Sequence, residues 1–123
     1  MKRNWAKTKK NGEPGIGVGP HCLHVGAVTL VWLRRFPAQV KRLGLSPQLL
    51  AFLAACHDVG KHSPGFLSKC PIWLQNEELV EQAIQEGWAQ LQDCGHERVS
   101  QAALYDWFLG KGKTPANAHA YPR

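Results

Sequence analysis

The 123-residue sequence lacks the features that define several large classes of protein. None of its cysteines, at 22, 56, 70 and 94, forms a Cys-x-x-Cys pair, and the ligand spacing of a zinc finger is absent. The basic start MKRNWAKTKKNG has no apolar segment of the kind a secretory signal peptide requires. No stretch approaches the roughly 18 to 20 apolar residues of a membrane span. We therefore expect a cytoplasmic protein with reduced thiols and no membrane partner, with structural zinc at the cysteines as the alternative.

The composition favours one folded domain with an anionic partner. The length is that of a single domain, and 44% hydrophobic residues are enough to form a core. The net charge of +6 favours nucleic acid as the first candidate partner and a membrane surface as the second. Neither the strand-type alternation of apolar residues nor an internal repeat is present, so the sequence predicts an all-α fold.

Helical patterns fill the chain between an irregular segment at 1–19 and a flexible tail at 111–123. Within the first segment, we expect Trp5 to anchor the chain to the body. Ser46 and Pro47 form a good helix start, and Gly60 and Gly110 are placed to end helices. A linker is expected before Ser46. The pattern predicts four or so packed helices, over 21–36, 48–59, 72–91 and 96–109.

Apolar spacing predicts which helix faces are buried. The helix at 48–59 is apolar nearly all round, which is typical of a central helix in a bundle. The inward-facing residues expected on 21–36 are Leu23, Ala27, Leu30 and Val31. Those expected on 72–91 are Leu74, Leu79, Ile84, Trp88 and Leu91.

The stretch LLAFLAACHDVGKHSPGF ends an apolar helix on the adjacent pair His57 and Asp58. Two further histidines, His21 and His96, each begin a predicted helix. Helix ends that meet at one end of a bundle can bring such side chains to a single ion. Imidazole and carboxylate groups suit divalent Mn, Fe, Ni or Zn. The alternative is that each residue lies at an ordinary solvent-exposed helix end.

Four ordered segments resemble the HD nuclease domain of the CRISPR-associated helicase-nuclease of type I systems. HDVGKHSPGF resembles the signature HD-x-GK-x-x-P-x-F, and NWAKT resembles an early Trp-Ala/Gly-Lys-Ser/Thr segment. HCLHVGAV resembles the helix H-x-x-D-V-A-A-V, and GHERVSQAAL resembles a later His-containing helix start. The resemblance spans Trp5 to Leu104 and implies an HD-type helical domain over 20–110.

The resemblance also implies roles for particular residues. His21, His57 and Asp58 match metal ligands, and His96 matches the next ligand histidine. Asp58 and Lys61 would be catalytic, because an ammonium beside a metal centre can orient a phosphate or stabilise negative charge. The implied cofactors are divalent ions of Mn, Ni, Fe, Co or Mg. The implied partners are single-stranded DNA, a helicase domain and an RNA-guided effector complex.

The sequence departs from the family pattern in two ways. His24 stands where the family has Asp, and no His-His pair or later Asp ligand follows the His96 helix, where His119 stands alone. We therefore expect that the chain is the N-terminal part of such a domain and that its nuclease activity alone is weak or absent. The sequence also contains no Walker A motif, which a helicase motor requires. Two alternatives stay open: an HD phosphohydrolase acting on a nucleotide, and a non-catalytic helical binding module with a vestigial site.

Overall fold

The computed structural model describes residues 4–112, apart from the side chains of residues 93, 94, 111 and 112. Within that range there is no β-strand, only the isolated bridges Trp5–Gly17 and Thr8–Pro14, so the predicted all-α class is confirmed. None of the described helices is both long and apolar enough to cross a membrane. The elements in chain order are α1 (Val18–Arg35), α2 (Pro37–Leu43), α3 (Pro47–Cys56), the 3-10 helix η1 (Val59–His62), α4 (Pro64–Leu67), α5 (Pro71–Asn76), α6 (Val80–Gln85), the 3-10 helix η2 (Trp88–Cys94) and α7 (His96–Gly112).

Residues 4–17 form a loop that folds back on itself and is closed by backbone hydrogen bonds. The amide of Ala6 donates to the carbonyl of Ile16, and that of Val18 donates to Asn4. Trp5 is buried, lies 4.5 Å from the ring of Phe66, and donates its indole N–H to the carbonyl of Leu67. The expectation that Trp5 anchors this irregular segment is confirmed.

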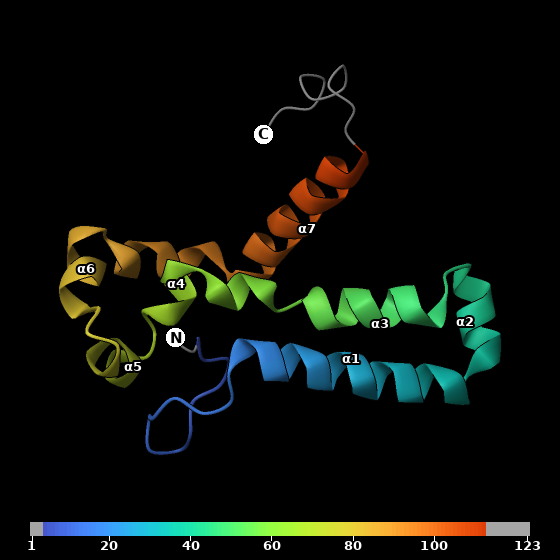
Figure 1. Cartoon of the computed structure of the whole chain (residues 1–123), viewed down its shortest axis with the longest axis horizontal. Helices are drawn as coiled ribbons and strands as arrows, with labels where there is room; N and C mark the ends of the chain where they lie inside the picture. The colour runs from blue at the N-terminus through green and yellow to red at the C-terminus, as the bar shows by residue number, and fades with distance from the viewer. Residues whose placement is uncertain (1–3, 113–123) are drawn as a thin grey trace.

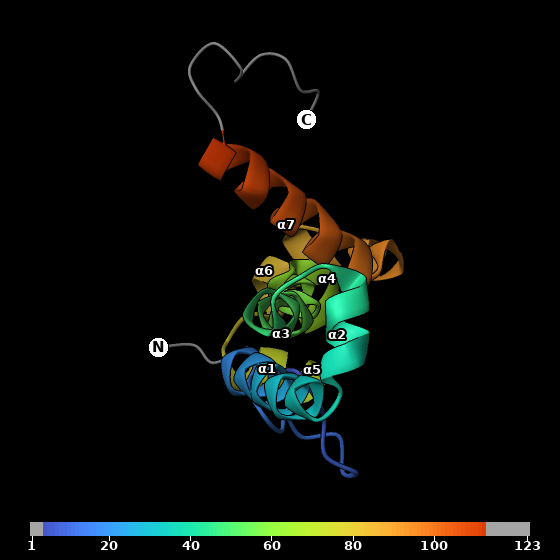
Figure 2. The same cartoon turned by 90° about the vertical axis from the view of Figure 1, so that its right-hand side faces the viewer.

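Helices α1 and α3 form a long antiparallel pair joined by α2, as two perpendicular views show (Figures 1 and 2). They approach closely at Gly26, where a Cβ atom would lie 3.0 Å from the Cβ of Ala55. The inward stripe predicted for α1 is wrong at Leu23 and Val31, which are 73% and 61% exposed, whereas Leu30 is half-buried. The side of α1 with lower exposure carries Cys22, Val25, Gly26, Thr29 and Leu33.

The connection between α1 and α3 is itself helical, where we expected a linker. Pro37 does break α1, but it also occupies the first turn of α2, where its missing N–H costs nothing. Helix α3 begins as predicted, with the Ser46 hydroxyl accepting the amide of Leu49. It is less central than expected, since Ala51 is its one fully buried residue, and it ends at Cys56 rather than at Gly60.

The apolar core lies at the end of the molecule formed by α4, α5, α6, η2 and the N-terminal loop. Its buried residues are Trp5, Leu67, Cys70, Trp73, Leu74, Leu79, Ala83 and Trp88. The single helix predicted over 72–91 is wrong, because positive φ angles at Glu78 and Gly87 divide it into α5, α6 and η2. Leu74, Leu79 and Trp88 are buried as predicted, whereas Ile84 and Leu91 are exposed.

Helix α7 begins at His96, as the sequence predicted, and leaves the body at an angle to the α1–α3 pair (Figure 1). It continues past Gly110 to Gly112. Most of the tail predicted at 111–123, including His119, lies outside the described residues. The start of α7 packs on η1, and this contact brings His96 to the segment that follows α3.

Candidate metal centre

The carboxylate of Asp58 is the centre of a cluster built from three parts of the chain. His21 lies in the first turns of α1, His57 ends α3, and His96 begins α7. Their Nε2 atoms lie 2.7, 3.3 and 3.2 Å from the oxygens of Asp58. Four residues predicted from widely separated segments are therefore brought together, although this proximity alone does not make them ligands.

Lys61 completes the cluster from η1. Its Nζ lies 3.0 Å from Oδ2 of Asp58 and 5.5 Å from the centre of the Phe66 ring. Burial alone raises the pKa of Asp58, but hydrogen bonds from Lys61 and His21 and the charges of Lys61 and His57 outweigh it. The pKa of Asp58 is therefore below its ordinary value, and the carboxylate is ionised at neutral pH.

The cluster is open to solvent on the side of His57. The side chain of Asp58 is 6% exposed and that of Lys61 is 9% exposed, whereas that of His57 is 52% exposed. His57 is therefore the member of the cluster that is most accessible to solvent.

The hydrogen bonding of His57 fixes its proton. Nδ1 lies 2.5 Å from the carbonyl oxygen of Ala54, and because a carbonyl only accepts, Nδ1 is the donor. In neutral His57 the other nitrogen, Nε2, then carries a lone pair that faces Oδ2 of Asp58 at 3.3 Å. Two acceptors in this position repel each other unless a cation, either a proton on Nε2 or a metal ion, is shared between them.

A buried hydrogen-bonded clasp holds His96 against this cluster. The hydroxyl of Ser100 accepts the amide of Gly60 at 2.8 Å and donates to the carbonyl of His96 at 2.9 Å. Gly60 permits this approach, since a Cβ there would lie 2.0 Å from the His96 carbonyl oxygen. The sequence reasoning treated Gly60 as a helix end and missed Ser100, although both stand in the segments that carried the resemblance.

The side chains of the cluster are of the chemical types that bind a divalent metal ion. Within residues 4–112, no group of three or more His, Cys, Asp or Glu side chains is already arranged to hold a metal ion. His21, His57, His96 and Asp58 still offer imidazole nitrogen and carboxylate oxygen, the donors that borderline divalent ions prefer. These four side chains would hold the ion, and each histidine already has Nε2 within 3.3 Å of an Asp58 oxygen.

Other predicted features lie away from the cluster or at its edge. His24 is exposed on α1, and Nδ1 of His62 accepts a hydrogen bond from the side-chain amide of Asn4. Cys22, Cys56 and Cys70 are free thiols. Burial is the largest cause of the raised pKa of Cys22 and Cys56, so both are protonated near neutral pH.

The fold is all-α, and two further helices each bring a histidine to the His-Asp pair. This combination is that of an HD-type helical domain. A comparison with protein families agrees with this class, because residues 5–121 match the family described as Cas3, HD domain. The chain belongs to this family, whose members are the HD nuclease module of Cas3. Neither the curated proteins nor the solved structures include a match.

Proposed function

We propose that this chain is a metal-dependent nuclease module that hydrolyses single-stranded DNA in type I CRISPR interference. The observation that carries the proposal is the convergence of three histidine Nε2 atoms on the one buried carboxylate of Asp58, with that of His57 at 3.3 Å. His21 and His96 bring further imidazoles to the same carboxylate. Family membership supports nuclease chemistry, and the net charge of +6 suits a polyanionic substrate.

In this proposal His21, His57, Asp58 and His96 hold one divalent ion. The bound ion supplies Lewis-acid chemistry and lowers the pKa of bound water. Nδ1–H of His57 donates to Ala54 and so directs Nε2 into the site. Lys61 keeps Asp58 ionised and provides a positive charge beside a phosphodiester.

We propose weak activity for the isolated chain, because these four side chains supply donors for one ion and not for two. The Cas3-type assignment also implies a helicase domain and an RNA-guided effector complex as partners. Mn, Ni, Fe and Co suit this imidazole-rich donor set better than Mg, which prefers oxygen ligands, and titration with each ion tests the choice among them.

The experiment measures cleavage of a labelled single-stranded oligonucleotide with Mn²⁺ or Ni²⁺. We expect slow cleavage by the wild-type chain and none in EDTA or in Asp58→Asn. Glu81→Gln is the matched control, since Glu81 is an exposed carboxylate on α6 that forms no ion pair with the cluster. Equal cleavage by wild type and Asp58→Asn would contradict a centre at Asp58.

Two other outcomes separate the alternatives. Metal binding that depends on Asp58, without cleavage of any nucleic acid, would favour a non-catalytic binding module. Release of phosphate from nucleotides in preference to cleavage of single-stranded DNA would favour an HD phosphohydrolase.

A further inference from the structure

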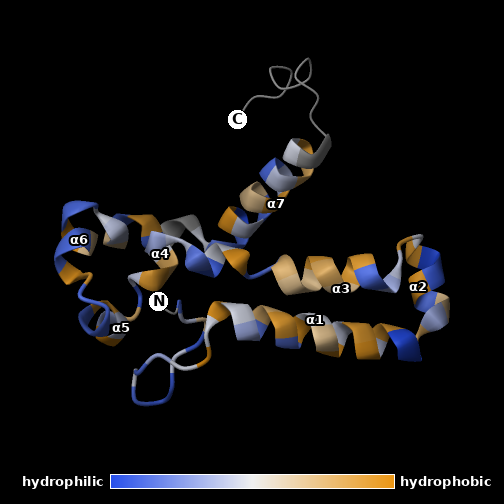
Figure 3. Cartoon of the chain, in the orientation of Figure 1, coloured by the Kyte–Doolittle hydropathy of each residue, from blue (hydrophilic) through white to orange (hydrophobic). Residues whose placement is uncertain are grey.

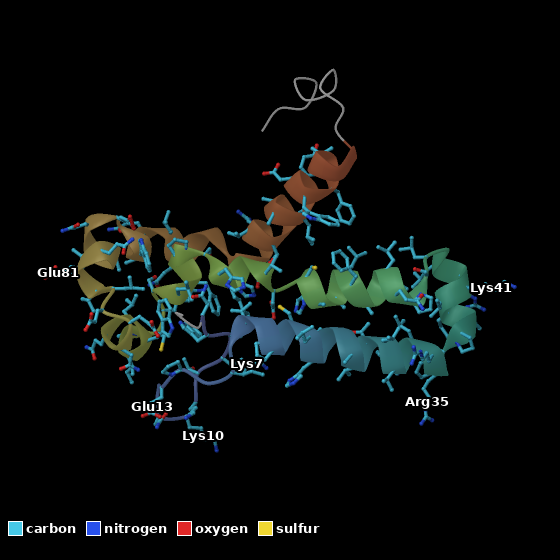
Figure 4. The ribbon with its side chains drawn as sticks, viewed as in Figure 1. Lys7, Lys10, Glu13, Arg35, Lys41 and Glu81 are labelled. Atoms are coloured by element: carbon cyan, nitrogen blue, oxygen red, sulfur yellow. The ribbon has the colours of Figure 1, made fainter. Side chains whose placement is uncertain are left out.

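The charges of this chain are unevenly distributed along the sequence and in space. No Asp or Glu occurs between Glu13 and Asp58, and the other acidic residues begin at Glu77. Helices α1, α2 and α3 therefore carry no carboxylate. Figure 4 shows the consequence, with Arg35 and Lys41 at the end of the molecule opposite Glu81.

Four cations gather where α1 meets α2. Arg34 and Arg35 lie in the last turn of α1, Lys41 and Arg42 lie in the last turn of α2, and all are exposed. None of the ion pairs formed within residues 4–112 involves them. Helix dipoles favour cations at these ends, but they do not account for the absence of any carboxylate nearby.

Exposed aromatic rings accompany these cations. Trp32 is 64% exposed and Phe36 is 41% exposed, and their rings meet edge to face with centres 5.4 Å apart. Arg35 lies beside Trp32 in a groove that Val28 and Val31 also line. Cations interleaved with accessible aromatic rings are the combination that binds a single strand, because phosphates pair with the cations and unpaired bases stack on the rings.

We propose that this corner binds single-stranded nucleic acid independently of the metal centre. Trp32 and Arg35 line one groove of the corner, Arg34 and Lys41 line another, and Phe36 and Arg42 complete it. Arg34 lies 13 positions after His21 in α1, a distance of roughly 20 Å along the helix axis. The corner is therefore a second contact outside the proposed site of cleavage. On the order of six stacked nucleotides span that distance.

The test measures the anisotropy of a labelled dT20 oligonucleotide in EDTA, so its outcome does not depend on the metal centre. The triple variant Arg34→Gln, Arg35→Gln, Lys41→Gln removes three corner charges. The matched control Lys7→Gln, Lys10→Gln, Arg98→Gln removes three exposed charges elsewhere, and circular dichroism verifies that both fold. We expect the corner variant to lower the slope of log affinity against log salt by about two, and the control to lower it by less than one.

A second pair of variants tests the aromatic part. We expect Trp32→Ala to weaken dT20 binding roughly 5- to 150-fold and Trp32→Phe to restore most of it, because either ring can stack on a base. Duplex DNA of the same length should bind more weakly, since its bases are already stacked. Equal losses in the two charge triples, equal binding of duplex, or a dimer by sedimentation that Trp32→Ala dissociates would each overturn the proposal.

Discussion

At the residue scale, Asp58 connects every other member of the cluster and is its single carboxylate. We expect Asp58→Asn to eliminate Mn²⁺ binding measured by calorimetry, since the variant removes the anionic donor. The same change leaves Lys61 buried without its counter-ion, which costs about 3–5 kcal/mol of stability.

A double variant separates these two effects. Asp58→Asn with Lys61→Met removes both members of the ion pair and should recover much of the lost stability without restoring metal binding. Unchanged Mn²⁺ affinity in the double variant would show that the metal binds elsewhere.

Gly60 and Ser100 position His96, and this leads to a second prediction. A methyl group in Gly60→Ala would collide with the backbone of His96 and Ser100, which cannot rotate away as a side chain can. We expect a loss of about 1–3 kcal/mol in unfolding free energy, measured by urea denaturation, together with weaker metal binding. Gly110→Ala in α7, the helix that carries His96 and Ser100, is the control, because nothing lies within 4 Å of the Cβ position at Gly110. Equal stabilities of the two variants would contradict the clasp.

The sequence singled out His21, His57, Asp58 and His96 as candidates, because they lie at helix ends and match the family pattern, and the structure brings them together. Ser100 could not be predicted in the same way. Its role depends on the amide of Gly60, 40 residues away, and only the packing of α7 on η1 brings the two together.

At the scale of elements, Trp5 is the buried side chain that anchors the N-terminal loop to the core. We expect Trp5→Ala to destabilise the chain by about 3–5 kcal/mol, because it removes a buried indole from Phe66 and leaves a cavity. Limited trypsin digestion should then cut faster at Lys7, Lys9 and Lys10. Trp32→Ala is the control, because Trp32 is 64% exposed. Equal digestion of the two variants would show that backbone pairing alone holds the loop.

Element boundaries were predicted well where a cap marks them and poorly where tertiary packing sets them. Ser46 marks the start of α3, and Gly95 precedes the start of α7. The break at Glu78 has no glycine or proline to signal it. There the amide of Leu79 donates to Leu74, and this turn places Leu79 in the core. Burial of Leu79 thus outweighs the helical periodicity of 72–91.

At the scale of the whole molecule, apolar burial is concentrated at one end. The core cluster joins the N-terminal loop to α4, α5, α6 and η2. Apolar residues are also frequent along α1 and α3 (Figure 3), but Val28, Val31 and Phe52 remain exposed there. The proposed metal centre lies between these regions, because Asp58 follows α3 and precedes the core segment.

This uneven burial predicts an order of hydrogen-exchange protection, measured by mass spectrometry in EDTA. Amides around Trp73 and Leu74 should exchange most slowly, because local opening there exposes the core. Amides of α1 and α3 should be intermediate. Amides of 101–110 in α7 should exchange fastest of the three, since that part of the helix is mostly exposed and a helix of this length is marginal without packing. Added Mn²⁺ should slow exchange around His21, Asp58 and His96 in the wild type and not in Asp58→Asn with Lys61→Met. Protection at 101–110 equal to that at Trp73 would contradict this distribution of stability.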